Sequence, residues 1–341
     1  MFVYKANYSL RTALRVLIPI HSFTAKNENE LYAKVRGFDW SEYLTERQTF
    51  AIDNTIGKNS SVKHSKFAAL KTKDAIVDQF RDKSGKRPSV DTDNPDVLLN
   101  IHGFKDEFTI SLDSSGNPLN QRGYRKPGGH RATLNEVLGA GLVMLSGWDQ
   151  NSTLLDPMCG SGTIPIEAAM MAKGIPPQIL RNEFGFMSWK NFNAILWNRV
   201  KSEARSTKRR NRAKVFASDL YGDNVKLVKQ SAKKLGLTIG FEIDTADFIK
   251  IITPSNKGTI VSNPPYGERI GGSQIDEFYK KIGDKLKQDF EDWDAWMISS
   301  NFKALRALRL KPTEKHILFN GSLECQYCKY EMYAGSRDED N

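Results

Sequence analysis

The segment Asn263-Pro264-Pro265-Tyr266 has the residue types of a site that accepts hydrogen bonds from an amine. Two consecutive prolines after a strand-like run cannot continue a central strand, so the backbone must leave the sheet rigidly here. A fixed asparagine side-chain oxygen and a fixed proline carbonyl can accept both hydrogens of an exocyclic amino group and stabilise charge developing on its nitrogen. Tyr266 can stack on the ring that carries this amine. We therefore expect these four residues to be catalytic.

A second candidate segment runs from Asp156 to Thr163 and reads Asp-Pro-Met-Cys-Gly-Ser-Gly-Thr, between a strand-like and a helical run. Glycines at such a junction let the backbone approach a ligand, and the next helix presents free N–H groups to it. No Lys-Ser or Lys-Thr pair completes a phosphate-binding P-loop. The acid at the strand end can instead hold a cationic amino group. The residues expected to bind this ligand are Asp156, Pro157, Met158, Cys159, Gly160, Gly162 and Thr163.

Two further acids end later strand-like runs. Asp219 follows the run 214–218, and a carboxylate there can accept both hydroxyls of a ribose. Asp247 follows the run 241–244, and with Phe248 beside it can hold an adenine amino group and cover one face of the ring. Either acid alone is more typical of a solvated loop. Three acids that end three successive strands form a more specific pattern, which predicts a cofactor containing a nucleoside.

Composition limits the partners and the compartment. The 341 residues include 50 basic and 40 acidic side chains, and a net charge of +10 favours a polyanionic partner. No apolar run approaches the roughly 18 residues of a membrane span, and no secretory signal opens the chain. Three cysteines fit a reducing compartment, so we expect a cytoplasmic protein without a membrane partner. Cys325 and Cys328 lack two further ligands for zinc, so we expect no metal and interpret 323–330 as a strand.

The second half of the chain alternates strand-like and helical periodicity, which predicts an open parallel sheet with helices on both faces. Asn320-Gly321, between two strand-like runs, adds an antiparallel hairpin at the C-terminal edge. The strands are expected at 153–157, 214–218, 241–244, 259–262, 295–299, 316–319 and 323–330, and the helices at 133–145, 164–172, 223–235 and 275–290.

A smaller α/β unit is expected before this sheet. Its strands are predicted at 14–20, 49–56, 97–101 and 107–112, and its helices at 28–35 and 68–81. The turn-rich stretch 114–118 ends this unit and a basic stretch follows it. We therefore expect three parts: a first domain over 1–115, a basic connector over 116–132, and a second domain over 133–341.

The chain resembles the THUMP-domain methyltransferases, and most closely the bacterial large-subunit rRNA guanine-N2 methyltransferases, from about residue 11 to residue 330. The resemblance implies a Rossmann-like class I methyltransferase domain after a small α/β THUMP domain that binds RNA. It also implies S-adenosylmethionine as methyl donor, 23S rRNA or a ribosomal assembly intermediate as partner, and guanine N2 as the target atom. The residues that carry it are 155–163, 262–269, Arg122-Gly123-Tyr124-Arg125, 70–78 and 87–91.

The chain departs from this family in three places. The family begins with a ferredoxin-like segment of roughly fifty residues, and this chain starts partway into it. Longer members append a second methyltransferase domain, which does not follow Asn341 in this sequence. The connector has Gly128-Gly129-His130-Arg131-Ala132 where a more hydrophobic stretch is expected. We therefore expect a shortened N-terminal segment and a single methyltransferase domain.

Basic residues in three regions are candidates for RNA binding. One cluster lies in the first domain and another in the connector, while the third, within 199–214, has eight basic residues and one acid. A solvated helix face explains this last cluster equally well. The RNA-binding candidates are Lys63, Lys66, Lys71, Lys73, Arg122, Arg125, Arg209, Arg210 and Arg212.

Alternative functions remain open at this stage. A THUMP-type tRNA guanine-N2 methyltransferase would share both key segments. An adenine-N6 methyltransferase of DNA or RNA would also use Asn-Pro-Pro-Tyr, because that motif serves any exocyclic amine. An RNA-binding factor could retain the fold without activity, but intact Asp156, Gly160, Gly162, Asn263 and Tyr266 argue against this.

Overall fold

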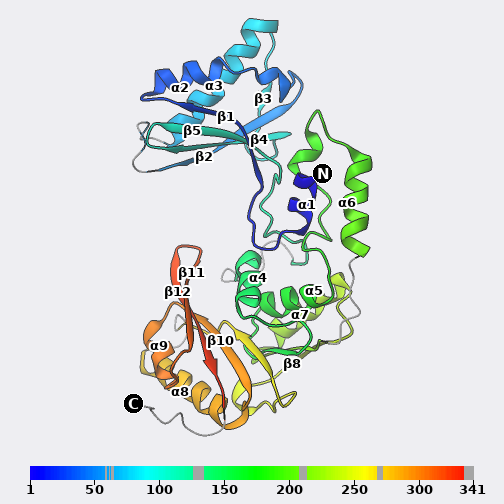
Figure 1. Cartoon of the computed structure of the whole chain (residues 1–341), viewed down its shortest axis with the longest axis vertical. Helices are drawn as coiled ribbons and strands as arrows, with labels where there is room; N and C mark the ends of the chain where they lie inside the picture. The colour runs from blue at the N-terminus through cyan, green and yellow to red at the C-terminus, as the bar shows by residue number, and fades with distance from the viewer. Residues whose placement is uncertain are drawn as a thin grey trace. The chain divides into compact units, whose positions relative to one another are not determined.

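The computed structural model describes residues 1–57, 60, 62, 65–125, 134–206, 213–266 and 272–333. The chain forms two compact units (Figure 1). The first contains Met1–Gln121 and Arg181–Ser202, and the second contains Arg122–Leu180 and Glu203–Asn341. The first unit thus gains a segment from the middle of the chain, in addition to the N-terminal residues expected in it. The stretch expected as a connector is divided after Gln121.

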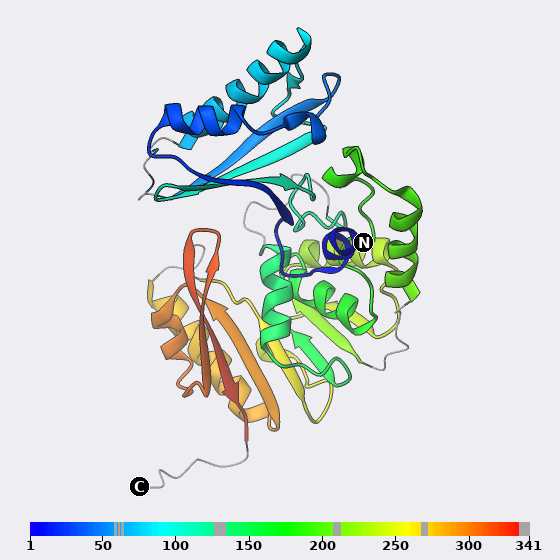
Figure 2. The same ribbon diagram turned by 45° about the horizontal axis from the view of Figure 1, so that its top comes forward.

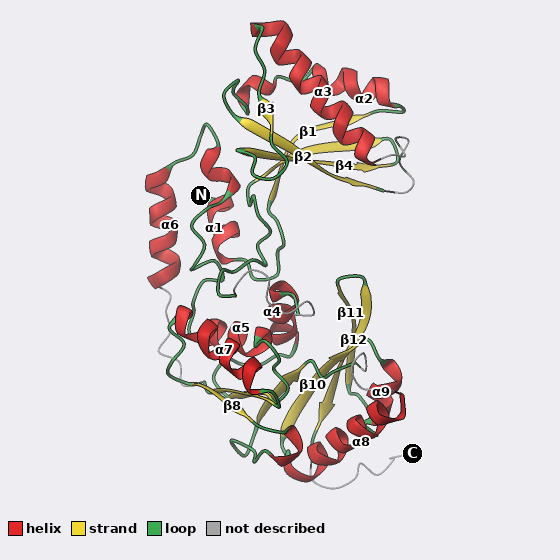
Figure 3. Ribbon diagram, turned by 180° about the vertical axis from the view of Figure 1, so that it is seen from behind, coloured by secondary structure: helices red, strands yellow, loops and turns green. Residues whose placement is uncertain are grey.

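A mixed five-stranded sheet is the centre of the first unit within the described residues. Its order is β1 (Leu17–Thr24), β5 (Glu107–Asp113), β4 (Val97–Phe104), β2 (Thr49–Ile56) and β3 (Ser89–Val90). Helices α2 (Glu28–Arg36) and α3 (Ser65–Ser84) cover one face of this sheet (Figure 3). Alternating buried positions in β4, such as Val97, Leu99 and Ile101, form its core with residues of both helices.

The predicted strand 14–20 begins later than expected, at Leu17, and continues to Thr24. The backbone before Leu17 does not belong to the strand. It bonds instead to the chain that follows β5, where Leu14 O accepts from Leu119 N and Val16 O accepts from Ser114 N. Local propensity does not reveal this partner, which is distant in sequence.

Helix α1 (Phe2–Ser9), which sequence periodicity did not indicate, packs in the first unit on the segment 181–202. Its Tyr4 ring lies 4.5 Å from Phe186 and 5.9 Å from Trp197, measured between ring centroids. The Tyr4 hydroxyl also accepts a hydrogen bond from Asn193 N at 3.0 Å. Aromatic burial of this kind explains why the segment 181–202 belongs to the first unit.

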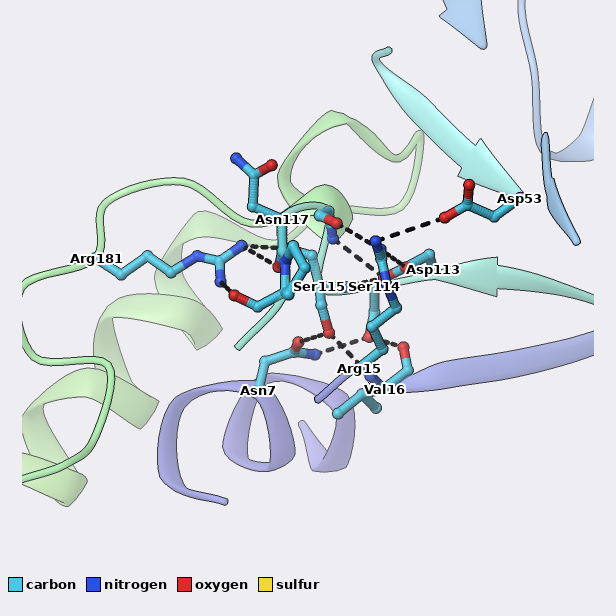
Figure 4. A network of polar contacts seen from close by, with 11 residues as sticks. Asn7, Arg15, Val16, Asp53, Asp113, Ser114, Ser115, Asn117 and Arg181 are labelled. Atoms are coloured by element: carbon cyan, nitrogen blue, oxygen red, sulfur yellow. Dashed lines mark hydrogen bonds and ion pairs between the residues drawn. The ribbon is translucent and has the colours of Figure 1, made fainter. Parts of the chain in front are cut away.

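Buried polar groups join the ends of these elements (Figure 4). Asn7 of α1 donates to Ser114 Oγ at 2.7 Å and accepts from Ser115 Oγ at 2.7 Å, and all three residues are fully buried. Arg15, before β1, pairs with the buried carboxylate of Asp113 at the end of β5. Arg181 donates to Ser115 O at 2.6 Å. Because unpaired polar groups are costly when buried, these bonds specify one arrangement of the first unit.

The second unit contains a seven-stranded sheet within the described residues (Figure 2). Its order is β11 (Glu314–Asn320), β12 (Leu323–Glu331), β10 (Trp293–Ser299), β9 (Gly258–Ser262), β6 (Thr153–Asp156), β7 (Val215–Asp219) and β8 (Phe241–Thr245). The strands from β10 to β8 are parallel, while β12 pairs antiparallel with both β10 and β11. A mostly parallel sheet that ends in an antiparallel hairpin confirms the expected fold.

Helices cover both faces of the second sheet (Figure 3). One buried cluster includes residues of α4 (Glu136–Leu145), α5 (Thr163–Ala172) and α7 (Gly222–Leu235). The cluster on the other face includes residues of α8 (Gly272–Asp289) and α9 (Phe302–Ala307). The remaining helical elements are α6 (Ala194–Ser206) and the 3₁₀ turns η1 (Trp40–Glu42), η2 (Gly185–Ser188) and η3 (Phe248–Lys250). None of the described helices combines the length and apolar character needed to span a bilayer.

Candidate active site

Both candidate segments meet at the carboxyl edge of neighbouring strands in the second unit. Asp156 ends β6 and Ser262 ends β9, which pair in parallel. Ser262 Oγ donates to Asp156 Oδ1 at 2.8 Å, and Met158 N also donates to this oxygen at 3.3 Å. Asn263 follows Ser262 directly, so this contact links the glycine-containing turn to the asparagine-proline segment.

The glycine-containing turn has a backbone that other residues cannot easily adopt. Gly160 and Gly162 have φ values of 52° and 80°. A Cβ on Gly162 would lie 2.6 Å from Val228 Cγ2, whereas a Cβ on Gly160 would meet nothing within 4 Å. Gly162 thus allows α5 to begin against α7, and Gly160 leaves open space beside the turn. That open space suits a bound ligand.

Asp219 at the end of β7 organises the turn through three hydrogen bonds. Its Oδ2 accepts from Gly160 N at 2.8 Å, and its Oδ1 accepts from Tyr221 N and Asn224 Nδ2, both at 2.9 Å. A carboxylate has about four acceptor positions, so about one is left for a ligand. Binding both hydroxyls of a ribose would therefore displace one of these bonds.

Asp247, the third predicted acid, has only some of the neighbours expected for it. Asp247 is half-buried and caps η3, where its Oδ1 accepts from Ile249 N at 3.1 Å. Phe248 is 3% exposed and packs on Phe290 with 5.9 Å between ring centroids. Phe248, expected to cover one face of an adenine ring, has almost no exposed surface, because its ring fills the core beneath α8. Half-buried Ile249 is the neighbouring apolar side chain that stays partly accessible.

The predicted catalytic residues leave the sheet together at the end of β9. Asn263 is half-buried, Pro264 is buried and Pro265 is exposed. The Tyr266 hydroxyl donates to Asn263 Oδ1, and its ring packs partly into the core beside Cys325. In this arrangement the tyrosine hydroxyl occupies the asparagine oxygen that an incoming amine would need.

Three residues that sequence reasoning missed support this segment from behind. The Tyr279 hydroxyl of α8 donates to Pro265 O at 3.2 Å and lies 3.2 Å from Ser299 Oγ. Asn301, which caps α9, donates from its side chain to Tyr266 O at 3.1 Å and from its backbone N to Ser299 Oγ at 3.1 Å. Tyr279 and Ser299 are fully buried, so these bonds fix two successive carbonyls of the loop. No local motif marks these residues.

Burial controls the charge of Asp156. Desolvation raises the pKa of this carboxyl from 3.8 to about 7, although hydrogen bonds from Ser262 and Met158 N oppose the shift. The buried thiol of Cys159 likewise has a raised pKa, chiefly through desolvation. A cationic ligand group near Asp156 would favour its ionised form, so this acid is suited to bind such a group.

Two connector residues predicted to bind RNA make contacts within the second unit. The Arg122 side chain is fully buried and pairs with the fully buried Glu167, with 3.4 Å between Nε and Oε1. Because no part of its guanidinium reaches the surface, the prediction that Arg122 binds RNA is wrong. Arg125 bonds to Thr163 Oγ1 and pairs with Glu136 at 3.1 Å. It anchors the start of α5 and α4.

The remaining basic candidates are only partly described. Lys66 is exposed on α3, Lys71 lies 5.4 Å from the Phe67 ring centroid, and Lys73 pairs with Asp74 at 2.8 Å. The other four, Lys63, Arg209, Arg210 and Arg212, lie outside the described residues. Trp197, which precedes the last three in the sequence, is 3% exposed and belongs to the aromatic cluster of the first unit.

Cys325 and Cys328 lie on β12 as predicted, and both are buried with free thiols. No group of three or more metal-ligating side chains occurs among the described residues.

Two family models match the chain. Residues 25–113 match the THUMP domain, and residues 122–329 match the RMKL-like methyltransferase domain. The "Ribosomal RNA large subunit methyltransferase K/L" of Shewanella frigidimarina is 36% identical over 99% of the chain and 48% of its own length. The chain therefore spans about half the length of this and several other curated relatives that it matches.

Two further proteins are similar to this chain over most of its length and most of their own. The Synechocystis protein named "Putative RNA methyltransferase slr0064" is 36% identical over 97% of the chain and 86% of its own length. The crystal structure of SMU.472 complexed with SAH is 27% identical, covers 98% of this chain and 88% of that one, and superposes with a TM-score of 0.87.

Proposed function

Because the chain belongs to the RMKL-like methyltransferase family and carries a THUMP domain, we propose that it methylates the exocyclic N2 of a guanine in 23S rRNA. The methyl donor is S-adenosylmethionine, and the reaction takes place in the cytoplasm on rRNA or a ribosomal assembly intermediate. The link between Asp156 and Ser262 carries this proposal, because it joins a cofactor turn to an amine-binding segment.

The residues at the sheet edge fit this donor, which supplies a methyl group activated by a sulfonium. Open space beside Gly160 admits the ligand. Asp156, with its raised pKa, ionises to pair with the amino group of the methionine moiety. Asp219 takes a ribose hydroxyl at its remaining acceptor position, and Asp247 with Ile249 lies at the adenine end. The residues proposed to line the turn are Pro157, Met158, Cys159, Gly160, Gly162 and Thr163.

The fixed loop supplies the oxygens that bind the target amine. Pro265 O already accepts from Tyr279, so Pro264 O and Asn263 Oδ1 are the acceptors proposed for the two amine hydrogens. The base displaces the Tyr266 hydroxyl from Asn263 and stacks on the freed ring. Hydrogen bonds from both amine hydrogens to these oxygens localise the lone pair on nitrogen for in-line attack on the methyl group. The methylated nitrogen then loses one proton, and the prolines limit reorganisation.

Mapping methylated guanines in rRNA and tRNA by mass spectrometry, with and without this gene, tests the proposal. One N2-methylguanine should disappear from 23S rRNA in the deletion strain and return with the wild-type gene. The Asn263→Ala variant should not restore it, although it should bind S-adenosylhomocysteine nearly as well as wild type. Loss from tRNA alone would replace rRNA by tRNA as the substrate, and loss of an N6-methyladenine would replace guanine.

A further inference from the structure

Helix α9 is joined to the catalytic segment through its first turn. Asn301 caps this helix by accepting from Ala304 N at 3.0 Å, and its side chain also donates to Tyr266 O at 3.1 Å. Because α9 follows β10, which runs parallel to β9, this turn lies at the edge where Asn263 leaves the sheet. Side chains on the first turn of α9 therefore lie next to the proposed site of methyl transfer.

Packing buries one face of α9 and leaves the other exposed. Ala304, Leu305 and the C-terminal cap Leu308 belong to the core cluster that this helix shares with α8. The two helices lie side by side (Figures 1 and 3), and a Cβ on Gly283 of α8 would overlap with Leu308 O. Side chains on the exposed face are thus carried by a helix that has little freedom to shift.

The exposed face of α9 carries two cations. Lys303 and Arg306 are three residues apart, so their side chains are neighbours on the helix surface. The Lys303 side chain is 75% exposed and pairs with Asp276 of α8 at 2.8 Å. Arg306 is exposed, and no acidic side chain pairs with it among the described residues. Because an exposed ion pair contributes little to stability, a phosphate can compete for the Lys303 ammonium.

The charge of α9 differs from that of α8 beside it. Helix α8 contains four lysines and four acids, so its formal charge is zero. In contrast, the stretch from Phe302 to Thr313 contains four basic residues and no acid. Positive charge is therefore concentrated on α9 and the segment after it, which favours a partner that carries a row of phosphates.

We propose that Lys303 and Arg306 bind successive phosphates of the RNA strand on one side of the target nucleotide. Phosphate contacts fix register without reading sequence, so this face positions the base for the acceptors of the catalytic loop. The partner is the backbone of one flank only, because β9 has β10 and α9 on one side and β6 with the cofactor turn on the other. This inference rests on the proposed function, which supplies the target nucleotide.

The first experiment measures the affinity for an RNA fragment that carries the mapped guanine, over a salt series. Lys303→Gln with Arg306→Gln (the α9 variant) should lower the logarithmic salt slope by about 1.4, or about 0.7 for each lost phosphate contact. Lys226→Gln with Lys229→Gln is the control on α7, because Lys226 is 74% exposed and pairs with Asp223 at 3.0 Å. An unchanged slope in the α9 variant, or equal changes in both double variants, would overturn the proposal.

The second experiment locates the contact with RNAs shortened on one flank of the guanine or on the other. Shortening the flank that lies on α9 should weaken binding to wild type about tenfold but change binding to the α9 variant less than twofold, because those phosphates have already lost their partners. Shortening the other flank should weaken both proteins equally. Losses that add to those of the variant for both flanks would overturn the proposal.

Both experiments measure binding, so they separate this inference from the proposed function. Wild type that binds the RNA but transfers no methyl group to it would overturn the proposed function alone. Cofactor affinity should match wild type in both double variants and shows that they are folded. If Lys303→Gln disturbs the fold by releasing Asp276, Arg306→Gln alone should still lower the salt slope by about 0.7, and an unchanged slope would overturn the contact.

Discussion

Ser262 Oγ donates a 2.8 Å hydrogen bond to the buried carboxyl of Asp156, across the boundary between β9 and β6. Each residue stands at the start of one of the two segments that carry the proposed chemistry. The bond keeps the cofactor turn and the amine-binding loop in register, because both strands end at the same edge of a parallel sheet.

The first prediction concerns this bond. Ser262→Ala should lower the free energy of unfolding by about 1–3 kcal/mol, because a buried acceptor loses its donor. Urea unfolding at neutral pH measures the change. Ser255→Ala, which removes the partly exposed donor to Lys257 O, should cost much less. If both variants lose the same free energy of unfolding, the hydrogen bond to Asp156 contributes no more to stability than the exposed one.

The second prediction follows from the Asp156 pKa of about 7. If the bound amino group requires the carboxylate, affinity for S-adenosylhomocysteine should rise about tenfold as pH rises from about 6 to about 8. Calorimetric titration across this range measures it. Asp156→Asn should bind more weakly and lose this pH dependence, and a wild-type affinity that is flat with pH would contradict the assignment.

The same pKa predicts how stability changes with pH. Between about pH 4 and pH 7 the folded protein keeps a proton on Asp156 that the unfolded chain has released, since its ordinary pKa is 3.8. The contribution of Asp156 to stability is therefore fully present below pH 3.8 and declines as pH rises through about 7. Asp156→Asn should remove this decline, as measured by unfolding without cofactor at several pH values.

The third prediction concerns the hydroxyl of Tyr279. Tyr279→Phe should lower kcat about tenfold while leaving the affinity for S-adenosylhomocysteine unchanged, because the groups that lose their partner, Pro265 O and Ser299 Oγ, lie behind the catalytic segment and not at the cofactor turn. Tyr330→Phe is a matched control, since Tyr330 is buried in the same cluster but interacts with Cys328. Steady-state kinetics and cofactor titration separate the two effects, and equal kcat losses in both variants would contradict a positioning role.

The fourth prediction concerns the buried pair of Arg122 and Glu167. Arg122→Ala should destabilise the protein by about 3–5 kcal/mol, because it leaves a buried carboxylate without its ion pair. Replacing both residues by Met and Leu should cost less than this single change. At temperatures where both variants stay folded, RNA affinity and its salt dependence should match wild type. If RNA binding by Arg122→Ala depends less on salt than binding by wild type, Arg122 contacts RNA after all.

The fifth prediction concerns the basic residues Arg209, Arg210 and Arg212, proposed from the sequence as an RNA-binding cluster. Reversing all three charges should weaken RNA binding and flatten its salt dependence, because each lost phosphate contact removes about 0.7–0.9 from the logarithmic salt slope. Filter binding over a salt series measures both. Lys226→Glu, on the exposed surface of α7, should change them less, and an unchanged slope in the triple variant would exclude the cluster.

The sequence alone determined the periodic elements and the two chemical segments. The positions of the strands along the second unit, the C-terminal hairpin and the glycine-containing turn are encoded by nearby residues, because backbone propensity and turn chemistry act over short distances. The strand interpretation of Cys325 and Cys328 follows in the same way and is confirmed. The resemblance to THUMP-domain methyltransferases also required only the sequence.

Only the tertiary structure decided which polar side chains are buried and what they contact. Arg122 and Phe248 have the residue types of surface ligands, yet packing places one in a buried ion pair and the other in the core. Tyr279 and Asn301 have no local signal, because their role depends on carbonyls that the fold brings to them. Burial and contacts between distant residues are properties of the packed chain, so spacing along the sequence cannot reveal them.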